Sequence, residues 1–127
     1  MQINAKFQHY NFNVVDMEKA LAFYDQALGL KPVRETAAED GSFRLVFLGD
    51  GQTEFKLELT WLRDWDRPYE LGDNEIHLCL SVPAESYEDI WAYHKAQGWV
   101  CYENESMHLY FIADPDNHWI EMVSDNR

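Results

Sequence analysis

Hydrophobic and polar residues alternate near the start of the chain and then change to a helical spacing. Residues 7–14 alternate as a half-buried strand requires. Asp16 then offers an N-cap, hydrophobic residues recur at helical spacing up to Leu28, and Gly29 is a typical residue at a helix end. We therefore predict a strand followed by an amphipathic helix of about three turns.

Three more strands are predicted after this helix, because turn-forming residues at 39–41 and 50–51 separate hydrophobic stretches. The polar segment 62–74 contains Pro68 and Gly72 and is predicted to be a linker. The expected strands are 31–35, 43–49 and 54–61.

The same order of elements is then repeated, which indicates one internal duplication. We expect an α+β fold built from two βαβββ modules, at about 5–61 and 75–124, on either side of the linker. The second module is predicted to contain a strand at 75–82, a helix at 86–97, and strands at 100–103, 108–113 and 118–123.

Composition and charge narrow the classes of function. The length of 127 residues and the 46% hydrophobic content are typical of one globular domain. A net charge of −13 repels phosphate backbones and anionic membranes, so nucleic acid and membrane partners are not expected. Without a membrane-span pattern or a signal peptide, the expected location is the cytoplasm. Cys79 and Cys101 form no metal-binding or disulfide pattern and are expected to be reduced.

One histidine and one glutamate occupy matching places in each half. His9 and Glu58 are 49 positions apart, and His77 and Glu121 are 44 apart. Each glutamate lies between apolar neighbours on a predicted strand, and a carboxylate in such surroundings needs a partner. A divalent cation between the two halves would provide one. Ordinary hydrogen bonds would be the alternative for each residue alone.

This set of two imidazoles and two carboxylates would also suit catalysis. Its two negative charges balance a divalent ion, and an octahedral ion keeps two positions for water or substrate oxygens. The other histidines fit less well. His94 is predicted to be a surface imidazole at a helix end, His118 lies in a turn, and His108 is a candidate substrate contact.

Six motifs stand out along the chain, at 9–16, 22–29, 57–60, 69–72, 77–82 and 114–123. Together they resemble glyoxalase I (lactoylglutathione lyase) of the vicinal oxygen chelate superfamily, which includes bleomycin resistance proteins and dioxygenases. The resemblance covers nearly the whole chain, residues 1–127, as a single glyoxalase-like domain.

The resemblance implies a curved mixed sheet around a metal site, commonly completed in a homodimer. It also implies His9, Glu58, His77 and Glu121 as metal ligands, with nickel or cobalt preferred to zinc. The implied activity is methylglyoxal detoxification: a thiol–methylglyoxal hemithioacetal is isomerised to a thioester through an enediolate. Glu121 is the expected catalytic base, and Glu58 is its catalytic counterpart across the metal.

The chain departs from this family where the thiol is held. Asn13, Leu62 and Glu103 stand where the bacterial glutathione enzymes carry an arginine, an asparagine and a lysine. Glutathione has two carboxylates, and cations hold carboxylates through charge-assisted hydrogen bonds. Five other cations are candidate replacements: Arg34, Arg44, Lys56, Arg63 and Arg67.

Three alternatives therefore stay open. One is another metalloenzyme of the superfamily, such as a ring-cleaving dioxygenase or an epoxide-opening thiol transferase with two histidines and one glutamate, or a coenzyme A thioester epimerase. Another is a metal-free protein that binds a cationic drug, like the bleomycin-sequestering members. The third keeps the metal and acts on a dicarbonyl or hydroxy-ketone without a thiol.

Overall fold

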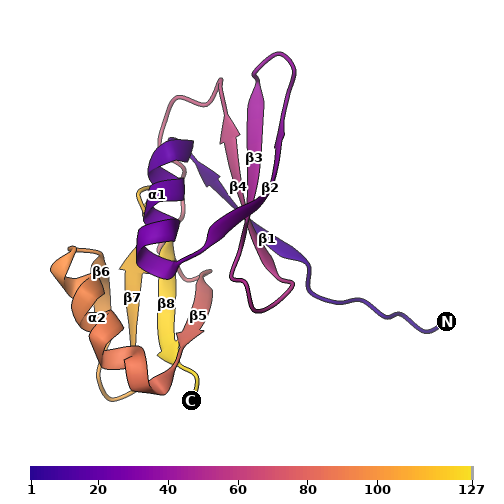
Figure 1. Cartoon of the computed structure of the whole chain (residues 1–127). Helices are drawn as coiled ribbons and strands as arrows, with labels where there is room; N and C mark the ends of the chain where they lie inside the picture. Colours follow the sequence, from indigo (N-terminus) through magenta and orange to yellow (C-terminus); the bar gives the residue numbers. More distant parts are fainter. Residues whose placement is uncertain (127) are drawn as a thin grey trace. The chain divides into compact units, whose positions relative to one another are not determined.

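The computed structural model describes residues 1–126 and consists of two compact units, Met1–Tyr69 and Glu70–Arg127. Each unit contains a four-stranded sheet and an α-helix. Figure 1 labels these strands and helices. The α+β class and the duplicated βαβββ order predicted from the sequence are confirmed.

The first unit has the strand order β1-β4-β3-β2. β1 runs parallel to β4, whereas the β3–β4 and β2–β3 pairs are antiparallel. Its elements are β1 (His9–Val14), α1 (Met17–Leu28), β2 (Lys31–Ala37), β3 (Phe43–Gly49) and β4 (Lys56–Leu62).

The second unit repeats this topology with the order β5-β8-β7-β6, in which β5 and β8 are the parallel pair. A short 3-10 helix precedes its α-helix. Its elements are β5 (Leu78–Val82), η1 (Ala84–Ser86), α2 (Tyr87–Ala96), β6 (Val100–Asn104), β7 (Leu109–Ala113) and β8 (Trp119–Ser124).

Local chemistry explains both ends of α1. The Asp16 side chain accepts a hydrogen bond from the Lys19 backbone N–H at 3.1 Å, which satisfies a donor that the first helical turn leaves free. Gly29 has φ +67°, a left-handed conformation that is favourable for glycine, and its N–H bonds to the Asp25 carbonyl. The helix therefore begins and ends where the sequence predicted.

Each sheet has one buried face and one open face, because successive strand residues point to opposite sides. In β4, Leu57 and Leu59 are buried, while Glu58 between them is partly exposed. In β8, Ile120 and Met122 are buried, while Glu121 is partly exposed. Both glutamates therefore lie on the open face of their own sheet.

His94 corrects one expectation, because it is fully buried rather than at the surface. Its Nδ1 lies 2.8 Å from the hydroxyl of Tyr110 on β7, so the imidazole joins α2 to the sheet. Burial, followed by the nearby Tyr87, raises the pKa of Tyr110, and its hydroxyl therefore stays protonated and available as a donor.

Among residues 1–126, no helix has the length and apolar character needed to cross a lipid bilayer.

Candidate functional site: two duplicated histidine–glutamate pairs

The first histidine–glutamate pair lies on the parallel strands β1 and β4. Glu58 on β4 is in register with Asn11 on β1, and His9 lies two residues before Asn11 on β1. His9 Nε2 is 3.7 Å from Glu58 Oε1, and His9 Nδ1 contacts the side-chain oxygen of Gln8. The register of the two strands therefore brings together the residues that the sequence placed 49 positions apart.

The second pair has the same construction. Glu121 is in register with Cys79, and His77 lies two residues before Cys79. His77 Nε2 is 2.9 Å from Glu121 Oε1. His77 was predicted within a strand at 75–82, but β5 begins at Leu78, so the imidazole lies at the strand entrance.

The His77 ring has a hydrogen-bonding oxygen next to each of its nitrogens. Nδ1 lies 3.1 Å from the Glu75 carbonyl oxygen, which only accepts hydrogen bonds, so this nitrogen carries a proton. On the other side of the ring, Nε2 lies 2.9 Å from Glu121 Oε1, and either a proton on Nε2 or a bound cation satisfies both atoms. Histidines that bind metals commonly donate their second N–H to a carbonyl in this way.

A phenylalanine supports each pair. Phe47 is in register with Glu58, and its ring makes an edge contact with His9 at a centroid distance of 5.4 Å. Phe111 is in register with Glu121 and contacts the ring of His77 at 4.9 Å. The duplication therefore includes the packing of each imidazole as well as the pair itself.

The two pairs differ in the residue that neighbours the glutamate. With the Asn11 amide oriented so that its nitrogen faces Glu58, Nδ2 lies 3.2 Å from Glu58 Oε1 and 2.5 Å from Thr60 Oγ1. Its other end contacts Asn13 at 2.7 Å. In the second unit, the equivalent register position is Cys79. An amide donor therefore helps to hold Glu58.

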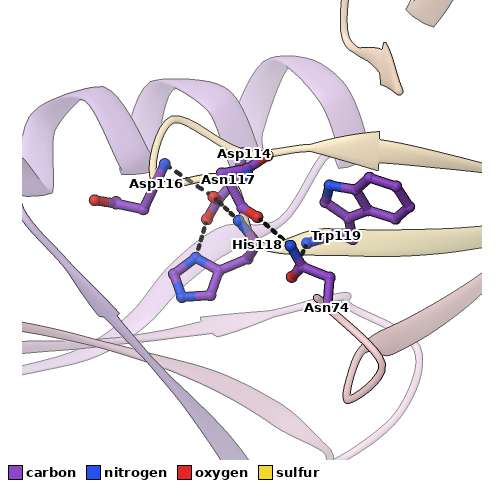
Figure 2. Close-up of polar contacts among 6 residues, drawn as sticks. All are labelled: Asn74, Asp114, Asp116, Asn117, His118 and Trp119. Carbon is purple, nitrogen blue, oxygen red and sulfur yellow. Dashed lines mark hydrogen bonds and ion pairs between the residues drawn. The ribbon is translucent and has the colours of Figure 1, made fainter. Parts of the chain in front are cut away.

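Three side chains that the sequence interpretation did not group also gather in the second unit. Ligand atoms of Asp114, Asp116 and His118 lie within 4.8 Å of one another and could hold a metal ion. Figure 2 shows the His118 ring turned toward Asp114, with Nδ1 2.8 Å from Oδ2. Asp114 Oδ1 also accepts from the backbone N–H groups of Asp116 and His118 at 2.9 and 2.8 Å.

These bonds give the Asp114 cluster a structural explanation. The Asp114 carboxylate is fully buried, and its two oxygens accept the hydrogen bonds that close the turn before β8. Asn74 adds a contact from the linker: it donates to the Asn117 carbonyl and accepts from the Trp119 N–H (Figure 2). The Asp-Pro-Asp sequence was a usable signal for this turn, whereas nothing in the sequence pointed to Asn74.

His108, the candidate substrate contact, and Glu103, which stands where the bacterial glutathione enzymes carry a lysine, line a pocket of about 260 Å³ beside α2. His108 has φ +55°, and its Nε2 is 3.7 Å from Glu88. Glu103 accepts hydrogen bonds from Lys95 at 2.5 Å and Trp91 at 2.6 Å, which lower the pKa of its carboxyl. Glu103 is therefore part of a link between β6 and α2.

Comparison with known proteins identifies related sequences and folds. Residues 6–122 match the model of the Glyoxalase/Bleomycin resistance protein/Dioxygenase superfamily. A lactoylglutathione lyase of Neisseria meningitidis is 31% identical, with 91% of this chain and 87% of that protein covered. One of Schizosaccharomyces pombe is 30% identical, and the match covers 95% of this chain and 48% of that protein, so the chain spans about half its length.

A similar solved structure is the glyoxalase I of Leishmania major, described as trypanothione-dependent. It has a TM-score of 0.79 and 26% sequence identity, and the match covers 97% of this chain and 88% of that chain.

Proposed function

Because the chain belongs to the Glyoxalase/Bleomycin resistance protein/Dioxygenase superfamily, we propose that it is a metal-dependent, glyoxalase I-like lyase. Its substrate in this proposal is the hemithioacetal of methylglyoxal and a thiol, which it isomerises to a thioester. The family match confirms the resemblance inferred from the motifs, and several curated relatives are named lactoylglutathione lyase.

The observation that supports a metal most strongly is the geometry of the two pairs. Adjacent ligands about 2.1 Å from an octahedral ion are separated by about 3.0 Å. The corresponding nitrogen–oxygen distances are 3.7 Å for His9–Glu58 and 2.9 Å for His77–Glu121. The four donors suit a divalent ion that both pairs bind together in a homodimer. We propose nickel or cobalt in preference to zinc.

The cluster at Asp114 is the weaker candidate for this ion. The hydrogen bonds that close its turn already use both oxygens of Asp114 and Nδ1 of His118. A metal there would have to replace bonds that hold the start of β8. At His77 and Glu121 it would replace only the contact between the two ligands themselves.

The proposed reaction is a proton transfer between neighbouring carbons. A divalent ion, when bound, polarises the substrate oxygens as a Lewis acid. The Glu121 carboxylate removes the proton from C1 of the hemithioacetal, and the electron pair moves into an enediolate. The proton then returns to C2, so the product is a thioester with the same atoms as the substrate. Glu58 would be the second carboxylate that holds the ion.

The test is to assay metal-free protein and protein loaded with nickel or cobalt, using methylglyoxal with a panel of thiols. We expect thioester formation only after loading, because the free protein lacks the electrophile for the developing oxyanion. The same rate without metal would contradict the proposal. Absence of thioester from every thiol would favour another reaction of the superfamily.

A further inference from the structure

We propose that Arg34 binds a carboxylate of the thiol substrate. This inference rests on the proposed function and identifies a residue for substrate recognition. Arg34 is exposed on β2, and its guanidinium lies over the ring of Phe47 at 5.3 Å. The same ring contacts His9, so Phe47 lies in contact with both the Arg34 guanidinium and the first histidine–glutamate pair.

The register of three strands places Arg34 on the open face of the sheet. Arg34 pairs with Phe47, and Phe47 pairs with Glu58. Residues opposite each other on neighbouring strands point to the same face. Because neighbouring strands are about 4.8 Å apart, the backbones of Arg34 and Glu58 are separated by about 10 Å. A substrate that reacts at the metal ligands could reach the guanidinium with its far end.

The other cations considered as replacement anchors have protein partners. Arg44 pairs with Glu18 at 2.6 Å and Glu35 at 2.5 Å. Arg63 pairs with Asp64, and Lys56 donates to the Glu54 carbonyl.

Arg67 stacks on Trp65 and lies 3.9 Å from Asp66. Among residues 1–126, Arg34 has no carboxylate within ion-pair distance, although the chain has 23 acidic residues and 10 lysines and arginines. Its five N–H donors therefore remain available for an anion.

The internal duplication supplies a comparison for Arg34. In the second unit, Tyr102 takes the same position: it pairs with Phe111, which pairs with Glu121. Tyr102 and Phe111 pack ring to ring at 6.0 Å. An uncharged ring is therefore sufficient to cover Phe111. By analogy, covering Phe47 does not require the positive charge of Arg34. We attribute the charge to recognition of an anion.

The test uses two thiols that differ only in their carboxylates, glutathione and its diethyl ester. Nickel-loaded protein is assayed with the methylglyoxal adduct of each. For Arg34→Gln, we expect kcat/KM to fall about tenfold to a hundredfold for the glutathione adduct, mainly through KM, because a charge-assisted hydrogen bond is lost. For the ester adduct, the change should stay below about threefold.

Arg34→Lys keeps the charge but loses the paired N–H donors of the guanidinium. Its kcat/KM for the glutathione adduct should therefore lie between that of the unmodified protein and that of Arg34→Gln. Arg63→Gln is the matched control for loss of an exposed arginine, and it should leave the preference between the adducts unchanged. Circular dichroism and thermal unfolding verify that each variant is folded.

Three results would separate the two proposals. If the unmodified protein converts neither adduct, the proposed function fails and the inference fails with it. If it converts them but Arg34→Gln affects both equally, or neither, the inference about Arg34 is wrong and the proposed function stands. Preference of the unmodified protein for the ester adduct would also overturn the inference.

Discussion

The single residues that matter most for the proposed chemistry are the two glutamates, and their surroundings differ. The side chains of Glu58 and Glu121 are 16% and 17% exposed, so both are shielded but open to a ligand. Asn11 contacts Glu58 through its amide, whereas Cys79 occupies the equivalent position beside Glu121. Hydrogen bonds from neighbouring residues orient metal ligands and strengthen metal binding.

Asn11→Leu should therefore weaken metal binding. Removing the amide donor frees the Glu58 carboxylate to rotate, and we expect nickel affinity to fall about tenfold. Competition with a chelator measures this affinity directly. Cys79→Ser is the control at the equivalent position of the second unit and should change the affinity less. Equal losses in both variants would contradict a specific role for Asn11.

At the scale of the elements, the two α-helices begin differently. Asp16 caps α1 through its side chain, whereas Ser86 makes no side-chain hydrogen bond at the start of α2, which η1 precedes. A side-chain cap satisfies a free N–H of the first turn and stabilises a helix by about 1 kcal/mol. The stability of the first unit should therefore depend on this one carboxylate.

Asp16→Ala should lower the free energy of unfolding by about 1 kcal/mol. Ser86→Ala removes the polar group at the other helix start, which makes no cap hydrogen bond, and should cost less than about 0.5 kcal/mol. Urea unfolding followed by circular dichroism gives both values. A larger loss for Ser86→Ala than for Asp16→Ala would show that capping does not control these helices.

The same helices show what the sequence could predict. The bounds of α1 follow from local signals, because Asp16 and Gly29 define its ends through their own backbone and side-chain bonds. The burial of His94 depends on the Tyr110 hydroxyl, 16 positions away, so a local pattern could not reveal it. Arg34 pairs with Phe47, and Tyr102 pairs with Phe111. Both pairings follow register shifts, after Pro32 and after Val100, which a simple alternation does not predict.

At the scale of the whole molecule, the duplication carries most of the functional argument. The sequence identified one histidine and one glutamate in each half, and each unit brings its own pair together at its parallel pair of strands, with His77 just before β5. The matching phenylalanines became apparent only from the sheet registers. That both pairs bind one ion remains the central proposal.

Nickel bound per chain, measured by elemental analysis after removal of free metal, tests this proposal most directly. We expect about one ion per chain for the unmodified protein, and a large loss for both His9→Gln and His77→Gln, because each removes a nitrogen ligand. His108→Gln is the control and should keep its nickel. Full nickel content in either ligand variant would contradict the account, as would loss of nickel from Asp116→Asn alone.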